Sequence, residues 1–139
     1  MDNEKIIFAF QLRNRKWVSI CQEKNDAYLV YRFGTSNKIE LQYPARLDSA
    51  SWQQFTFNGY NRGGGKQNAA MWYGFLYFIH KDVRYEIYHT WNSEDDKEKC
   101  GVTVIVNKKD IDMPGELRTK KGSLLSLLYN GKIKIEEEQ

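Results

Sequence analysis

The chain has 139 residues, which suits one domain that buries a substantial core without metals or disulfides. Hydrophobic residues make up 41% of it and prolines number only two, a composition that excludes a disordered or collagen-like chain. The 21 basic and 18 acidic residues give a formal net charge of +3, which is too balanced to require a polyanionic partner.

The N-terminal third is predicted to form short strands joined by polar turns. Strict alternation is clearest at residues 38–43, where Ile39, Leu41 and Tyr43 share one face and predict a half-buried strand. Pro44 ends that strand because proline cannot donate a hydrogen bond to a central ladder, and the polar residues 45–51 indicate a loop. The earlier expected strands are residues 5–12, 16–22 and 27–33.

Residues 52–91 hold 12 of the 20 aromatic residues of the chain. The segment 69–80 has apolar residues on both faces of the expected strand, which predicts a strand with little solvent on either side. The short turn at residues 80–82 predicts a hairpin with the strand that follows. The strands expected in this stretch are residues 52–60, 69–80 and 83–91.

The C-terminal third mixes one further strand with loops and a helix. The β-branched residues 101–106 predict a strand, whereas the charged residues 92–99 and the Pro114-containing residues 108–115 indicate connections, with a short strand near Leu117. Residues 123–130 predict a short helix, with Ser123 as its cap and Gly131 as its stop. An edge strand is expected at residues 132–135.

About eight short strands with polar turns predict an all-β, single-domain antiparallel meander with one short helix near the C-terminus. A parallel α/β fold is disfavoured because crossover helices are missing between the strands. The pattern leaves a closed barrel and a two-sheet sandwich as open alternatives.

No motif points to a cofactor, a metal or catalysis. The two histidines, His80 and His89, lack the further ligands of a zinc site, and no serine lies in a nucleophile elbow. Cys21 and Cys100 form no CxxC pair; they are expected to be reduced in a cytosolic protein and to be able to form one bridge in an exported one. A hydrolase with two dispersed carboxylates is the least favoured alternative.

The loop Arg62-Gly63-Gly64-Gly65-Lys66 combines flexible backbone with two cations. It lacks the serine or threonine of a Walker loop, so it is interpreted as a presented hairpin loop that contacts a partner, together with the loop at residues 92–99. The candidate partner-binding residues are Tyr60, Arg62, Gly63, Gly64, Gly65, Lys66 and Tyr88.

Three segments carry a resemblance: Tyr31-Arg32-Phe33-Gly34, then Lys38-Ile39-Glu40-Leu41 with Tyr43-Pro44, and Arg62-Gly63-Gly64-Gly65. Together they resemble a group of small bacterial proteins of uncharacterised function, many of which carry export signals. The resemblance implies a bacterial source, an all-β fold and residence in the envelope, and it supplies no catalytic residue. The chain is also loosely similar in form to periplasmic lysozyme inhibitors, which present a loop to an enzyme's cleft.

These observations predict a protein-binding module without enzymatic activity, of the inhibitor or immunity type. The alternative is a β-barrel that binds carbohydrate or single-stranded nucleic acid through exposed aromatics, with Trp72 and Tyr73 beside Tyr60 and Tyr88 as candidates. No membrane insertion is expected. The first ten residues lack the basic leader of a secretory signal, so the chain reads as cytoplasmic, or as periplasmic or secreted if a leader has been removed.

Overall fold

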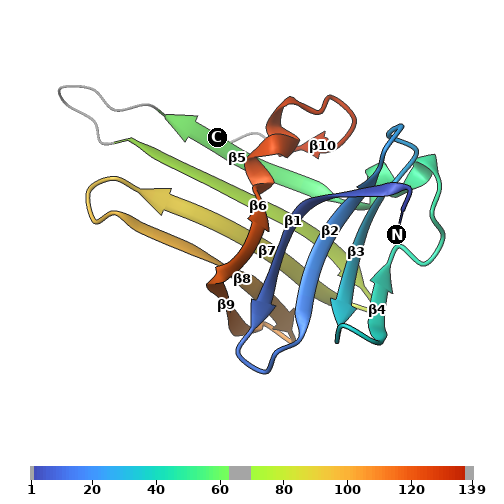
Figure 1. Ribbon diagram of the computed structural model, residues 1–139, viewed down its shortest axis with the longest axis horizontal. Helices are drawn as coiled ribbons and strands as arrows, with labels where there is room; N and C mark the ends of the chain where they lie inside the picture. The colour runs from blue at the N-terminus through green and yellow to red at the C-terminus, as the bar shows by residue number, and fades with distance from the viewer. Residues whose placement is uncertain (1, 63–69, 137–139) are drawn as a thin grey trace.

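The computed structural model describes residues 2–62 and 70–136 and contains one ten-stranded sheet (Figure 1). The strands follow the order β10-β5-β6-β7-β8-β9-β1-β2-β3-β4, and neighbours are antiparallel except for the parallel pair of β10 and β5. The elements are β1 (Glu4–Leu12), β2 (Trp17–Glu23), β3 (Leu29–Gly34), β4 (Ile39–Tyr43), the 3₁₀ helix η1 (Ser49–Gln54), β5 (Thr56–Arg62), β6 (Met71–His80), β7 (Val83–Asn92), β8 (Lys97–Val106), β9 (Lys109–Gly122), the 3₁₀ helix η2 (Leu124–Tyr129) and β10 (Lys134–Ile135).

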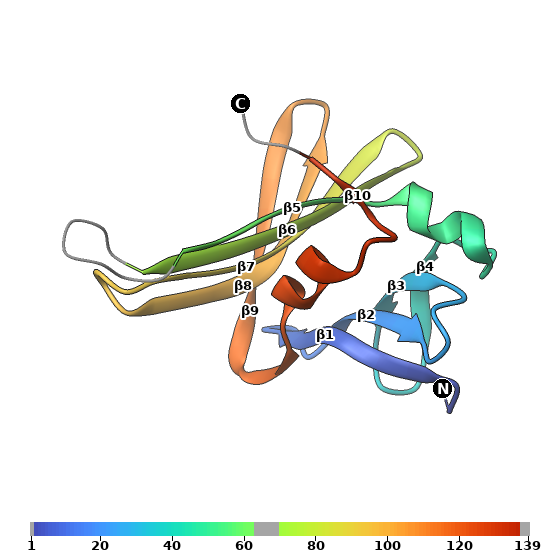
Figure 2. The same ribbon diagram turned by 90° about the horizontal axis from the view of Figure 1, so that it is seen from above.

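The sheet curls into a half-barrel with two crossing layers. Strands β5 to β8 form one layer and β1 to β4 form the other, and η2 lies between them at the open side (Figure 2). The fold is therefore neither a closed barrel nor a sandwich of two separate sheets. The prediction of an all-β fold is confirmed, but the structure has ten strands where about eight were predicted. The sheet also departs from an antiparallel meander, because β10 is parallel to β5 and β9 pairs with β1.

Strand β9 joins the two layers because it changes partner along its length. Its first half pairs with β8 as far as Pro114, and its second half pairs with β1 from Gly115 onward. Gly115 is required at this corner: a Cβ there would lie 2.5 Å from Cδ2 of Phe10 and 2.8 Å from Sγ of Cys100. The missing side chain lets the two layers approach closely where the sheet turns.

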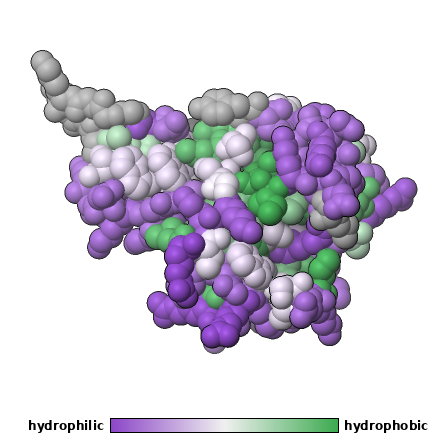
Figure 3. Space-filling view, in the orientation of Figure 1, coloured by the Kyte–Doolittle hydropathy of each residue, from purple (hydrophilic) through white to green (hydrophobic). Residues whose placement is uncertain are grey.

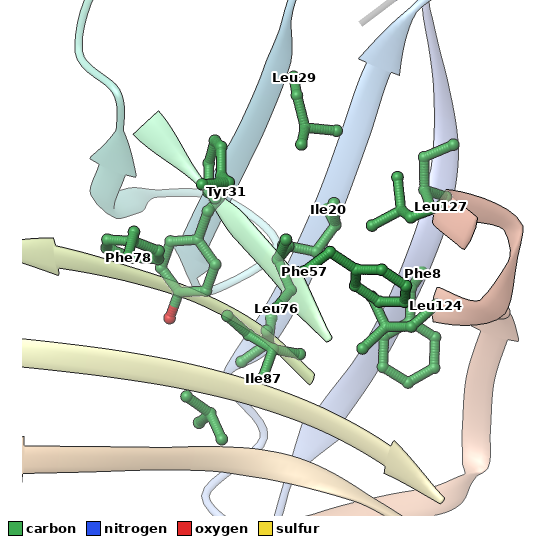
Figure 4. Packing of buried hydrophobic residues seen from close by; sticks show 14 of the residues in the cluster. Phe8, Ile20, Leu29, Tyr31, Phe57, Leu76, Phe78, Ile87, Leu124 and Leu127 are labelled. Atoms are coloured by element: carbon green, nitrogen blue, oxygen red, sulfur yellow. The ribbon is translucent and has the colours of Figure 1, made fainter. Parts of the chain in front are cut away.

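The core fills the inside of the curl. It combines alternate residues of both layers with side chains from the two 3₁₀ helices. Figure 4 labels members of both layers together with Leu124 and Leu127 of η2. On the face drawn in Figure 3, hydrophobic residues gather beside η2, and most of the remaining view is hydrophilic. The largest fully buried side chains are Phe8, Phe10, Ile20, Leu29, Tyr31, Phe55, Phe57, Leu76, Phe78, Ile87, Leu124 and Leu127.

The other face of the N-terminal layer holds a buried ion pair. The Arg32 guanidinium lies 2.6 Å from Glu4, and their side chains are only 10% and 2% exposed. Burial acts to raise the pKa of Glu4, but hydrogen bonds from Arg32 and Tyr28 outweigh it, so the pKa is lowered and the carboxylate stays charged. The pair fastens β1 to β3 beside a small cluster formed by Cys21, Tyr28 and Val30.

The turn predicted at residues 80–82 and the two ends predicted for the C-terminal helix are present in the structure. Lys81 and Asp82 both adopt positive φ, as a tight hairpin between β6 and β7 requires. The Ser123 hydroxyl accepts a hydrogen bond from the Leu125 amide at 3.2 Å, and Gly131 follows η2 with φ of 78°. The predicted helix is thus present, as a 3₁₀ helix.

Three predicted boundaries are wrong. Residues 52–54 belong to η1 rather than to a strand, and the Trp52 indole N–H donates to the Asp26 carbonyl at 3.1 Å, which anchors this helix in the core. The loop predicted at residues 92–99 is shorter in the structure, because β8 already begins at Lys97. Residues 108–115 were predicted as a connection, but β9 already begins at Lys109, and the short strand expected near Leu117 is part of its second half. Pro114 is accommodated where β9 changes partner.

Two predictions of burial are also wrong. Strand β6 was expected to be covered on both sides, but its Ile79 is 61% exposed while Leu76 is fully buried, because no described element covers the outer face. Ile39 was assigned to a half-buried face but is 49% exposed, since β4 is an edge strand. Its pairing with β3 shifts register between Phe33 and Gly34. Among the described residues, no helix has the length and apolar character needed to cross a membrane.

The two faces of β6 give a test of this architecture. Leu76→Ala should lower the free energy of unfolding by about 2–5 kcal/mol, because it empties part of the core. Ile79→Ala, three residues along the same strand, should change it by less than about 0.5 kcal/mol. Urea unfolding followed by tryptophan fluorescence measures both, and comparable losses in the two variants would refute the assignment of inner and outer faces.

Candidate functional site

The outer face of β5 to β8 is set by strand alternation. Phe57, Leu76, Ile87 and Val102 form one row across the four strands, and all four are fully buried in the core. Side chains one position away along each strand must therefore point to the opposite, solvent-facing side. That side carries an unusual number of aromatic residues.

Four aromatic side chains lie close together on this outer face. The rings of Tyr60 and Tyr73 stack with centroids 5.6 Å apart, and Phe75 lies 5.6 Å from Tyr73. Tyr88 is the cross-strand partner of Phe75. We call Tyr60, Tyr73, Phe75, Tyr88 and the neighbouring Met71 the aromatic surface.

The hydroxyl of Tyr88 is fixed at one side of the aromatic surface. It donates a hydrogen bond to Oδ1 of Asp112 at 2.8 Å, which ties β7 to the first half of β9 across β8. Burial, and then this bond, raise the pKa of Tyr88, so its hydroxyl stays protonated at physiological pH. The ring is thereby held in a defined orientation.

A groove of about 260 Å³ runs beside the aromatic surface. Its apolar wall includes Met71, Tyr73 and Phe75, and two cations, Lys97 and Lys99, lie along β8. Both lysines are exposed, as is the one carboxylate in the lining, Asp95. The full lining is Met71, Trp72, Tyr73, Phe75, Thr90, Trp91, Asn92, Asp95, Lys97 and Lys99.

The structure brings together the described members of the predicted binding site. Tyr60, Arg62 and Tyr88 all lie at outer-face positions of β5 and β7. Arg62, Met71, Asn92 and Lys97 form a row across four strands, so the predicted contact segments 62–66 and 92–99 begin at the same end of the sheet. Gly63, Gly64, Gly65 and Lys66 lie outside the described residues.

Sequence reasoning missed Phe75 and Met71 and misplaced Trp72. Phe75 lies two residues from Tyr73 and so points to the same face of β6. Strand alternation could therefore have identified it, but β6 was expected to be buried on both faces. Trp72 is adjacent to Tyr73 in the strand and so points to the inner face. Its ring centroid lies 4.5 Å from that of His89 and 6.4 Å from that of Trp91.

His89 forms a second cluster of interest, on the inner face. It is 1% exposed, stacks on Phe8 at 4.6 Å, and its Nε2 lies 2.7 Å from a Glu98 oxygen that also pairs with Lys120. Burial lowers the pKa of His89 against the opposing effect of Glu98. The neutral ring then donates from Nε2 to Glu98, and its Nδ1 has no partner among the described residues.

The described residues contain no constellation with evident reactivity. Within residues 2–62 and 70–136, no group of three histidine, cysteine or acidic residues is placed to hold a metal. Cys21 and Cys100 are both free and buried, and burial raises the pKa of Cys100 to about 11, so its thiol is protonated at neutral pH and a poor nucleophile.

No protein-family model, no curated protein and no solved structure matches the chain. The aromatic surface, with the adjoining lysines, is the largest concentration of predicted binding residues among those described.

The buried histidine predicts a pH dependence of stability. In the unfolded chain the histidine binds a proton near pH 6.5. In the folded chain the pKa of His89 is lowered, so the proton binds only at lower pH. The free energy of unfolding should thus fall as pH drops from 7 to 5, by up to about 1.4 kcal/mol per pH unit. His89→Gln should flatten that slope in denaturant titrations at each pH.

The control is His80→Gln, which removes the other histidine and should retain the wild-type slope. Equal slopes for the wild type and His89→Gln between pH 5 and 7 would contradict the neutral, buried assignment of His89.

Proposed function

We propose that this protein is a protein-binding module that docks an acidic partner on its aromatic surface. The observation that carries the proposal is the solvent-facing array of Tyr60, Tyr73 and Phe75 beside two exposed lysines. The role fits an inhibitor or immunity-type protein, which acts by occupying a partner's surface and needs no reactive group of its own.

The composition of this surface supports a protein partner. Interface centres are enriched in tyrosine, phenylalanine and methionine, which supply large rigid contact area at little cost in side-chain entropy. Tyr73 and Phe75 occupy the centre of the array and are half-buried, so the ring orientation is largely fixed before binding. Preorganisation of this kind reduces the entropy lost on association.

The charges around the array favour an acidic partner. Lys97 and Lys99 lie on β8 beside the aromatic rings, and Arg62 lies at the same end of the sheet. Such a cationic rim attracts an acidic surface and accelerates association in a salt-dependent way. Asp110 and Asp112 lie at the opposite side of the outer face, on β9, and give the contact a defined direction.

A glycan or single-stranded nucleic acid is the second candidate ligand. The exposed ring of Tyr60, stacked on Tyr73 next to cations, is also the kind of platform on which sugars and bases stack. Fluorescence titration with oligosaccharides and oligonucleotides separates the candidates, since nucleic-acid binding weakens steeply with salt. Saturable binding of either, lost in Tyr73→Ala, would favour this candidate over a protein partner.

Removing the central ring should abolish most of the affinity for a protein partner. Tyr73→Ala is expected to weaken binding by about 30-fold, which corresponds to a hot spot of about 2 kcal/mol. The measurement is biolayer interferometry against the protein that the wild type captures from lysate and culture fluid of its own organism. Ile79→Ala is the matched control, because it removes an exposed side chain of the same face and strand outside the array.

Reversing the cationic rim tests the electrostatic part of the proposal. Lys97→Glu with Lys99→Glu should slow association about tenfold at low salt and leave dissociation nearly unchanged. Lys108→Glu, in the turn between β8 and β9, is the control. Capture that Tyr73→Ala and the charge reversal leave intact would refute docking on the aromatic surface.

A further inference from the structure

The half-barrel has a second opening, separate from the aromatic surface. A cavity of about 390 Å³ lies where strands β3 and β4 of one layer meet the β6–β7 hairpin of the other. Its walls are formed by Phe33, Leu41, Tyr85 and Met113, which come from four different strands. This volume and apolar lining are those of small-molecule sites, which typically enclose about 300–1000 Å³.

The cavity is lined by a largely buried tyrosine whose hydroxyl has no hydrogen-bond partner among the described residues. Tyr31 lines it, is only 2% exposed, and its ring packs 5.0 Å from that of Phe78. Figure 4 shows the Tyr31 oxygen beyond the group of packed carbon side chains, on the Phe78 side of the cluster. Its hydroxyl forms no hydrogen bond with any described residue.

The hydroxyl opens into the cavity, where the acceptor atom of a ligand can take its hydrogen bond in place of water. Burial raises the pKa of Tyr31, so the group is a protonated donor throughout the physiological range. Phe33 and Leu41 supply no acceptor for it. The cavity therefore has an unused donor beside an apolar wall.

The mouth of the cavity carries positive charge. Lys81, in the β6–β7 turn, is exposed and lines the cavity, and His80 beside it adds ring nitrogens. The carboxylate there, Glu40, is already paired with Lys16 at 2.8 Å. An incoming anion thus meets a cation at the mouth and a hydroxyl donor within.

We propose that this cavity binds a small organic acid with one carboxylate and an apolar body. The body lies against Phe33, Leu41 and Met113, and the carboxylate takes a hydrogen bond from Tyr31 and the charge of Lys81. A neutral ligand of the same shape gains the apolar contacts but not the charge. The site is independent of the aromatic surface, which lies on the outer side of the sheet.

Methionine methyl groups provide a readout for both sites. Of the three methionines, Met113 lines the cavity and Met71 lines the groove of the aromatic surface. Octanoate added to protein labelled with ¹³C at the methionine methyls should shift the Met113 signal saturably and leave that of Met71 in place. Octanamide, which has the same chain without the charge, should bind about tenfold more weakly, as expected for the loss of about 1.4 kcal/mol.

Two variants test the polar contacts. Tyr31→Phe keeps the packing and should weaken octanoate binding about tenfold, and Lys81→Gln should weaken it several-fold while leaving octanamide unaffected. Lys108→Gln is the matched control, since Lys108 lies in the equivalent turn of the β8–β9 hairpin with φ of 66°, against 52° at Lys81.

Three results would overturn the proposal. These are no saturable shift of Met113 at millimolar octanoate, equal affinity for octanoate and octanamide, and full affinity in Tyr31→Phe. An equal shift of Met71 would mean that the acid coats apolar surface without selecting the cavity. None of these results bears on the docking of a protein at the aromatic surface, so the two proposals stand or fall separately.

Discussion

The change of partner along β9 is the constraint on which the rest of the structure depends. A strand that pairs with β8 over its first half and with β1 over its second must turn through the corner between the two layers. Gly115 permits this because its bare Cα leaves room for Phe10 and Cys100 at the closest approach. The curl of the sheet, the main core inside it and the position of η2 at the open side all follow from that corner.

The curl gives the two faces of the same strands opposite environments. On the inner face, the row Phe57, Leu76, Ile87 and Val102 meets the N-terminal layer and loses its contact with water. On the outer face nothing described covers the strands, so aromatic side chains there stay half-exposed. The aromatic density of residues 52–91 is thus divided between a core and a surface. A binding role for that surface needs no separate loop or insertion.

The sequence predicted those features that depend on local physics. The short turn at residues 80–82 and the cap at Ser123 depend on neighbouring residues only. By contrast, Pro114-Gly115 looks like a loop because nothing local reveals that one strand changes partner there. The exposure of Ile79 could not be predicted from the sequence either. A strand covered on both faces and a strand with one solvent-exposed hydrophobic face have the same pattern of apolar residues.

The same limit applies to the candidate sites. Tyr60, Arg62 and Tyr88 were found because exposed aromatics and cations stand out in a strand pattern. The cavity at Tyr31 was not found, because its walls come from strands far apart in the sequence and join only when the half-barrel curls. The unpaired hydroxyl is visible only when the packing around it is known.

The central claim is that the outer face of β5 to β8 is an open surface that a protein partner covers. Hydroxyl-radical footprinting of the free and partner-bound protein tests it most directly. In the free protein, Tyr73 and Phe75 should be oxidised faster than the buried Phe57. Partner binding should protect Tyr73 and Phe75 and leave Ile79 unchanged. Protection of these rings in the free protein, or protection elsewhere on binding, would contradict the account.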